Sequence, residues 1–178
     1  MKLLVIDVQK GITDEELYAY DSFVANVKTL IETARKNGVE IIYVQHDDGP
    51  GSGFTFGDEA FEISELFAPK EGEKIFVKEI NSAFGNKEFA AYLESQGDKD
   101  LMIIGLQTNF CIDATIKSAF ERGYKVYVPD GANSTFDNDY MTGETTCKYY
   151  NDFIWPSRFV DSIYMEDAIA LLEGKSIE

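Results

Sequence analysis

The sequence is poor in histidine, cysteine and basic residues, and each shortage excludes a class of function. Its 178 residues include one histidine, two cysteines and 16 lysines and arginines, against 32 aspartates and glutamates. A single histidine, His46, leaves none for a catalytic pair together with a histidine-rich metal site. Two cysteines, Cys111 and Cys147, give no disulfide framework and lack the C-x-x-C spacing of a redox module. A reduced, cytoplasmic setting is expected.

The charge balance and the hydropathy exclude two kinds of partner. A net charge of −16 argues against nucleic acid and anionic membrane surfaces, which bind basic patches. No apolar run approaches the ~20 residues that a membrane helix needs. The N-terminal run 3–6 meets Asp7 too early for a signal peptide. The acidity itself is read as a contribution to solubility.

The sequence instead has the composition and pattern of one folded α/β domain over residues 1–178. Hydrophobic residues make up 44% and charged residues 27% of the chain, which is typical of a soluble globular protein. Short apolar runs alternate with helical patterns, which is typical of a parallel sheet. The predicted strands are 3–6, 40–45, 74–78, 101–104, 125–128 and 160–164. The predicted helices are 22–36, 87–96, 111–122, 139–151 and 166–172.

The predicted helix ends rest on capping residues. Asp21 is a candidate N-cap and Gly38 a stop for the first long helix. Asn86 and Gly97 play the same parts for the helix 87–96.

Three polar residues follow apolar strands, and each has a chemical and a structural interpretation. Cys111 opens a helical pattern just after the run 101–104, where the helix dipole would favour a thiolate. Asp7 and Lys78 each end a predicted strand. In a parallel sheet these three would open onto one edge, where α/β proteins place their sites. Alone, the cysteine could fill core space, the aspartate could cap a loop, and the lysine could reach solvent.

Taken together, several segments resemble the isochorismatase-like cysteine hydrolases, a family that includes nicotinamidases, N-carbamoylsarcosine amidase and isochorismatase. The resemblance runs in order and with ordinary spacing from about residue 3 to 136. The matching segments are LVIDVQ (4–9), VK (77–78), NSAF (81–84), GLQTNFC (105–111), AT (114–115), AFERGY (119–124) and DGA (130–132).

The resemblance implies a three-layer α/β/α doubly wound fold with about six parallel strands in the order 3-2-1-4-5-6. Asp7 and Cys111 would then lie beside the crevice at the switch point of the sheet. Lys78 would start roughly 9–10 Å away, two strands from Asp7, and would have to reach across the end of the second strand.

The resemblance also implies a mechanism that uses Asp7, Lys78 and Cys111. Cys111 would attack an amide or carbamoyl carbon, Asp7 would move the proton, and Lys78 would stabilise the thiolate and hold Asp7. An acyl-enzyme would form and water would release the acid. The backbone N–H groups of Gln107 and Cys111 would bind the oxyanion, with a cis peptide bond between Leu106 and Gln107.

Four further residues are candidates for substrate contact: Gln9, His46, Asn81 and Phe84. Each also has a structural interpretation, since Gln9 could be exposed and Phe84 could belong to the core. His46 could bind substrate or a metal. The segment 45–50 reads QHDDGP and lacks the Asp-x-His pair and further histidine of nicotinamidases, so neither metal nor cofactor is expected.

The leading prediction is a metal-independent cysteine hydrolase that cleaves a small amide or carbamoyl C–N bond through a thioester. Isochorismatase-type vinyl ether hydrolysis is one alternative, and it would need Asp7 without Cys111. A non-catalytic small-molecule binding protein is another. A homo-oligomer is expected from the apolar cluster at 153–159, and the glycine-rich segment 49–54 could be a lid or a subunit contact.

Overall fold

The apolar run near the N-terminus forms the strand β1 (Lys2–Ile6), whose five residues are all buried. It lies inside a sheet, with β2 (Glu40–His46) on one side and β4 (Asp100–Leu106) on the other, both parallel to it. A strand covered on both faces needs apolar residues at nearly every position, which explains the unbroken run. The structure is a computed structural model that describes residues 1–177.

Parallel pairing extends the sheet to the order β3-β2-β1-β4-β5-β7, and the short strand β6 pairs with β4. The remaining strands are β3 (Lys74–Lys78), β5 (Lys125–Pro129), β6 (Asn133–Ser134) and β7 (Asp161–Ile163). The predicted α/β fold and strand order are therefore confirmed, with β7 as the sixth strand along the path.

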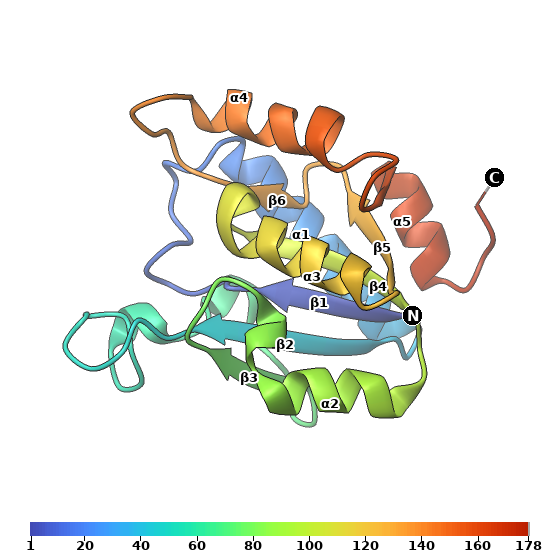
Figure 1. Ribbon diagram of the computed structural model, residues 1–178, viewed down its shortest axis with the longest axis horizontal. Helices are drawn as coiled ribbons and strands as arrows, with labels where there is room; N and C mark the ends of the chain where they lie inside the picture. Colours follow the sequence, from blue (N-terminus) through green and yellow to red (C-terminus); the bar gives the residue numbers. More distant parts are fainter. Residues whose placement is uncertain (178) are drawn as a thin grey trace.

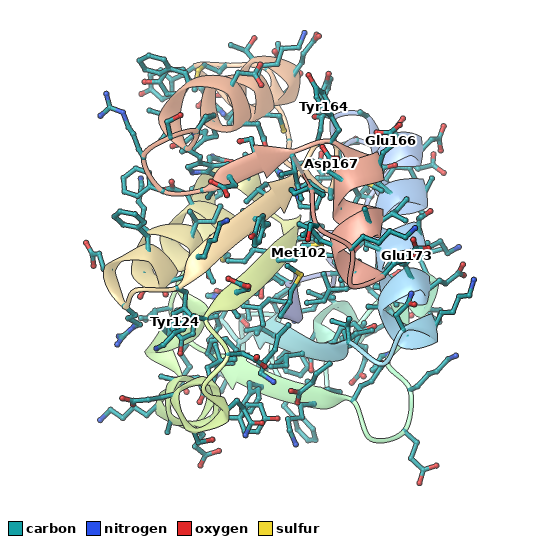
Figure 2. The ribbon with its side chains drawn as sticks, turned by 90° about the vertical axis from the view of Figure 1, so that its right-hand side faces the viewer. Met102, Tyr124, Tyr164, Glu166, Asp167 and Glu173 are labelled. Carbon is teal, nitrogen blue, oxygen red and sulfur yellow. The ribbon has the colours of Figure 1, made fainter. Side chains whose placement is uncertain are left out.

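Helices cover both faces of the sheet (Figure 1). Leu3 and Val5 of β1 pack into one core with α1 and α5, while Leu4 and Ile6 pack into the other with α2 and α3. Figure 2 shows α5 beside α1, with Met102 of β4 in the sheet next to them. The helices are α1 (Tyr20–Lys36), α2 (Lys87–Gln96), α3 (Asp113–Glu121), α4 (Gly143–Lys148) and α5 (Met165–Leu172).

Short helical turns occupy several connections. Three are 3₁₀ turns, at Glu59–Phe61, Glu65–Phe67 and Ala83–Gly85. Two are π-helical, at Thr108–Ile112 and Tyr149–Ile154. The first π-helical turn carries Cys111, so the cysteine precedes α3 instead of lying in its first turn.

Capping residues set the ends of α2 as predicted. The Asn86 side chain accepts a hydrogen bond from the N–H of Phe89, and Gly97 ends the helix with φ 74°. The start of α1 was predicted wrongly. The helix begins at Tyr20 after Ala19, whose φ is 52°, and Asp21 lies within the first turn instead of capping it.

The helix predicted over 139–151 starts later, as α4 at Gly143, and continues after Lys148 as the π-helical turn Tyr149–Ile154. Local hydrogen bonds explain the later start. The Asn138 side chain accepts from the N–H groups of Tyr140 and Met141, which holds that segment in a turn. The Thr142 hydroxyl accepts from the N–H of Thr145 and caps α4 there. Asn and Thr compete with the helix in this way wherever they can bond nearby backbone.

Within residues 1–177, no helix is both long enough and apolar enough to cross a membrane.

Candidate active site

The carboxyl ends of β1, β2 and β3 bring three polar side chains to one edge of the sheet. Asp7 directly follows β1, and its N–H donates to Val44 O on β2 at 2.8 Å. His46 ends β2 and is the register partner of Lys78, which ends β3. On the other side of β1, Ile6 is the partner of Gly105 near the end of β4. The sheet therefore gathers Asp7, His46 and Lys78 from segments more than 30 positions apart.

Lys78 spans the end of β2 and joins the site. Its Nζ lies 2.8 Å from Asp7 Oδ2, 2.8 Å from His46 Nδ1 and 3.2 Å from Cys111 Sγ. The Lys78 side chain is fully buried, so its methylene stem packs in the interior while its ammonium faces the other polar groups. The gap of two strands is closed by the full length of the lysine.

Asp7 has one carboxylate oxygen engaged and one free. Oδ2 accepts from Lys78, whereas Oδ1 is buried and has no hydrogen-bond partner among residues 1–177. A buried acceptor without a partner is costly, so its retention here points to a chemical role. The Asp7 backbone is also strained, with φ 50°, a left-handed conformation that non-glycine residues seldom adopt.

Burial shapes the electrostatics of the pair Asp7 and Cys111, and so bears on the expected thiolate. Burial, reinforced by the nearby Asp7 carboxylate, raises the pKa of Cys111 to about 12, and Lys78 only partly opposes this. Burial also raises the pKa of Asp7 above its usual range, despite the opposing charge of Lys78. One ammonium balances one anion, so the buried group keeps a single proton on Asp7 or Cys111. Burial therefore works against the expected thiolate, and the proton held between Asp7 and Cys111 is the one that a reaction here would move.

The backbone before Cys111 is shaped by Gly105 and the bond that follows Leu106. A side chain at Gly105 would place its Cβ 2.0 Å from Ile6 O, and the glycine has φ 120°. Only glycine fits this close approach of β4 to β1. The peptide bond between Leu106 and Gln107 is cis, as the resemblance implies. The Gln107 side chain is held by Thr135, whose hydroxyl donates to Gln107 Oε1 at 3.0 Å.

Cys111 opens onto a pocket of about 230 Å³, the size of a small molecule. Three of its walls are apolar and come from Ile12, Phe54 and Phe110. Phe54 belongs to the glycine-rich segment, which therefore contributes to the pocket. The polar lining comes from Asp7, His46, Asp48, Asn81, Gln107 and Cys111.

Two residues predicted to contact substrate do not line this pocket. Gln9 is fully buried, donates to His46 O and Phe61 O, and accepts from the His46 N–H. Its polar atoms thus hold the end of β2 and tie it to the 3₁₀ turn Glu59–Phe61. Phe84 packs against Phe89 and Tyr124 in the core on the α2 side, with ring centroids 5.2 and 5.8 Å away. Its side chain fills core space because the 3₁₀ turn Ala83–Gly85 directs it under α2.

The two other candidates do lie at the pocket. Asn81 Oδ1 is 3.9 Å from Cys111 Sγ, at the limit of a weak thiol hydrogen bond. His46 lines the pocket with its ring, and its Nε2 lies 2.9 Å from Asp48 Oδ1. Sequence reasoning missed Ile12, Asp48 and Phe110 as lining residues, and it considered Phe54 only as part of the glycine-rich segment 49–54. Phe54 and Phe110 had a signal, since each is an aromatic residue beside a candidate site segment.

The oxygen, nitrogen and sulfur atoms of Asp7, His46 and Cys111 lie within 4.8 Å of one another, close enough to be considered as metal ligands. The Lys78 ammonium, however, hydrogen-bonds to all three residues at once. A cation at their centre would be repelled by this charge, so the donor set fits a lysine better than a metal.

Comparisons with known proteins agree on one family. A family model described as the Isochorismatase domain matches residues 2–147. The chain is 32% identical over 138 residues to the isochorismatase family protein YddQ of Bacillus subtilis, covering 75% of this chain and 77% of YddQ. It is 27% identical to Nicotinamidase 3 of Arabidopsis thaliana, covering 77% of this chain and 74% of the relative. A crystal structure of an isochorismatase family protein superposes with a TM-score of 0.83 at 29% identity, covering 91% of this chain and 96% of that one.

Proposed function

The chain belongs to the isochorismatase family and is a hydrolase, and from that premise we propose that it cleaves a small amide or carbamoyl C–N bond with Cys111 as the nucleophile. The proposed enzyme is metal-independent and works through a covalent acyl-enzyme. Its catalytic residues are Asp7, Lys78 and Cys111.

One observation carries the proposal. The Lys78 ammonium hydrogen-bonds to both Asp7 Oδ2 and Cys111 Sγ, while Asp7 Oδ1 is buried with no partner in the described part of the chain. A base with a free oxygen, a thiol and a fixed cation are the parts that nucleophilic catalysis needs. A binding protein would gain nothing from a buried unpaired carboxylate oxygen, which costs stability.

The first half-reaction transfers the acyl group to sulfur. Asp7 takes the thiol proton, the Cys111 sulfur forms a bond to the carbonyl carbon, and the carbonyl becomes an oxyanion. Backbone N–H groups of Gln107 and Cys111 are proposed to bind that oxyanion. Asp7 then returns the proton to the nitrogen, the C–N bond breaks, and the amine leaves a thioester on Cys111.

The second half-reaction releases the acid. Water donates a proton to Asp7 as its oxygen attacks the thioester carbon, and the C–S bond then breaks. The proton on Asp7 returns to the Cys111 sulfur, so the enzyme ends in its starting state. Lys78 keeps its charge throughout and compensates whichever of the two groups is the anion.

The lining of the pocket favours a neutral or cationic substrate. The Lys78 ammonium balances the charge of Asp7, Asp48 adds a second carboxylate, and none of the lining residues is a lysine or arginine. The net charge of −16 adds to this field. A doubly anionic vinyl ether would meet repulsion here, which makes isochorismatase-type hydrolysis the weaker candidate.

The wider expectations belong to the same proposal: one domain, no cofactor, a cytoplasmic location and a homo-oligomer. The predicted aromatic cluster divides in the structure, since Trp155 is fully buried whereas Phe153 is 64% exposed. Any subunit contact from this cluster would therefore use Phe153 and its neighbour Tyr149, whose ring centroids are 5.5 Å apart. Sedimentation of wild type and Phe153→Ser would test this contact.

A panel of small primary amides and carbamoyl compounds, in matched neutral, cationic and anionic versions, would test the function by ammonia release. We expect turnover of a neutral or cationic member that a chelator does not reduce. Cys111→Ala should lower it by at least about 10³-fold, and Cys147→Ala should leave it unchanged. Ammonia release retained by Cys111→Ala would contradict the proposal. Hydrolysis of an isochorismate-like vinyl ether that Cys111→Ala retains and Asp7→Asn loses would support the alternative.

A further inference from the structure

The three bonds of Lys78 account for all of its donors. An ammonium carries three N–H groups and no acceptor. In this site Nζ lies 2.8 Å from Asp7 Oδ2, 3.2 Å from Cys111 Sγ and 2.8 Å from His46 Nδ1. The first two partners belong to the proposed reaction, and the third does not. The third bond therefore needs its own explanation.

That third bond fixes the form of His46. Because an ammonium can only donate, His46 Nδ1 must offer its lone pair, so the ring proton resides on Nε2. Asp48 Oδ1, 2.9 Å from Nε2, accepts this proton and selects the same form. The imidazole is thus an acceptor toward Lys78 and a donor toward the rim of the pocket.

The main chain around His46 is held as firmly as its ring. Gln9 Oε1 accepts from the His46 N–H at 2.7 Å, and Gln9 Nε2 donates to His46 O at 2.9 Å. Gln9 is completely buried. Asp48 is fixed in turn, since its N–H donates to Phe54 O at 3.1 Å. A ring pinned at both ends can impose a direction on the flexible lysine that it contacts.

We propose that His46, in the form selected by Asp48, is the positioning residue for Lys78. By taking one of the three donors, His46 sets the rotation of the ammonium about its Cε–Nζ bond, and the other two donors then face Asp7 and Cys111. Without His46, one donor of a buried ammonium lacks a partner, and the lysine gains a reason to turn away from the thiol. The inference rests on the proposed function, because it assigns His46 a part in activating Cys111.

Two amide substitutions separate the two nitrogens of the ring. In His46→Asn the side-chain oxygen can occupy the position of Nδ1 and accept from Lys78. In His46→Gln the longer side chain places its amide near the position of Nε2, where it reaches Asp48 but not Lys78. His46→Ala removes both. If His46 acts by accepting a hydrogen bond from Lys78, His46→Asn should preserve its effect on Cys111 and His46→Gln should not.

The probe is iodoacetamide, and the readout is the alkylation rate of Cys111 at pH 8 by peptide mass spectrometry. The Cys111 sulfur displaces iodide to form a thioether, and its proton passes to Asp7 or solvent. At a pH below the thiol pKa, the alkylation rate follows the fraction of Cys111 that is thiolate. If the loss of the His46 contact raises the pKa of Cys111 by one, the alkylation rate falls about tenfold. We expect about tenfold slower alkylation in His46→Ala and His46→Gln, and a rate within about threefold of wild type in His46→Asn.

Cys147 supplies the control for folding in the same samples. It is only 5% exposed, so faster labelling of Cys147 would report a loosened structure in any variant. His46→Ala also opens space beside Cys111, and easier access of iodoacetamide would raise the alkylation rate. A lower alkylation rate in this variant therefore identifies the loss of thiolate stabilisation.

Equal alkylation rates of Cys111 in wild type and the three His46 variants would overturn the inference. So would a rate that stays near wild type in His46→Gln and falls in His46→Asn. Since alkylation requires no turnover, a failed amide screen would count against the proposed function alone.

Discussion

Two lysines are buried at opposite ends of the same sheet, and their partners differ in kind. Lys2 begins β1 at the amino edge, and its side chain is 5% exposed; Lys78 ends β3 at the carboxyl edge with a side chain that is 0% exposed. Lys2 pairs with the carboxylates of Glu40 and Asp98, both partly open to solvent. Lys78 faces one carboxylate, a neutral imidazole and a thiol.

The pKa directions follow from these partners. At the amino edge, partial burial opposes the shift, but the hydrogen bonds from Lys2 and Tyr92 lower the pKa of Glu40. The Lys2 hydrogen bond also lowers the pKa of Asp98. At the carboxyl edge, burial raises the pKa of both Asp7 and Cys111. Lys2 thus pairs with carboxylates that stay ionised and stabilises the fold. Lys78 instead contacts two groups, Asp7 and Cys111, between which a proton can move.

The largest effect is expected from removing each lysine in turn. Lys78→Met should lower turnover by at least about 10³-fold, because the anion that forms on Asp7 or Cys111 loses its compensating charge. Lys2→Met should keep turnover but lower the free energy of unfolding by about 1–3 kcal/mol, because Glu40 and Asp98 lose their partner. Steady-state kinetics and urea unfolding of both variants would check this. Similar activity in the two variants would contradict the comparison.

Asp7→Asn should move two properties of the site in opposite directions. Turnover should fall about 10²–10³-fold, because an amide cannot accept the thiol proton. Alkylation of Cys111 by iodoacetamide at pH 8 should become faster, because the carboxylate is one of the groups that raise the pKa of Cys111. A parallel fall in both rates, with Cys147 labelling unchanged, would show that Asp7 activates the thiol at rest.

Two glycines sharpen the contrast between the edges in terms of stability. Gly105→Ala should cost about 3 kcal/mol or more, since its Cβ would lie 2.0 Å from Ile6 O. Gly97→Ala, near the amino end of β4, would place its Cβ with no atom of residues 1–177 within 4 Å, and should cost only about 1 kcal/mol through its φ of 74°. Chemical unfolding of both variants would measure the difference. Equal costs would mean that the approach of β4 to β1 relaxes easily.

The smallest effect concerns acid stability at the amino edge. A carboxylate with a lowered folded-state pKa stabilises the fold above its ordinary pKa of about 4.3, and that stability is lost as the pH falls through the folded value. Glu40→Gln should therefore have a lower free energy of unfolding than wild type at pH 7, by less than about 1 kcal/mol, and should melt at a lower temperature. This difference between the two proteins should disappear below about pH 4. A gap that widens in acid would reverse the sign assigned to Glu40. Melting curves from pH 3 to 7 would decide.

The sequence predicted the strand order and many of the helix and strand boundaries. The strand order was expected from the family resemblance, and the ends of α2 followed from Asn86 and Gly97, whose capping needs no distant partner. The start of α4 was missed because Asn138 and Thr142 bond to nearby backbone, which a hydrophobic period does not reveal.

The site was only partly readable from the sequence. Asp7, Lys78 and Cys111 could be placed at strand ends, but the reach of Lys78 depends on the shape of the sheet. The raised pKa of Cys111 arises from burial and from Asp7, which is 104 positions away in the chain. Phe54 lines the pocket from an irregular segment and Phe110 from the short π-helical turn Thr108–Ile112, and neither has a periodicity that indicates direction. Tertiary contacts decide each of these features.

The most direct test of the central claim is the mass of the enzyme during turnover. A substrate from the amide panel would be mixed with wild type, quenched in acid within milliseconds to seconds, and analysed by intact and peptide mass spectrometry. The account requires an added acyl group on the peptide that contains Cys111, absent from Cys111→Ala and from the peptide of Cys147. Turnover with no adduct on Cys111, at a rate that Cys111→Ala retains, would contradict it.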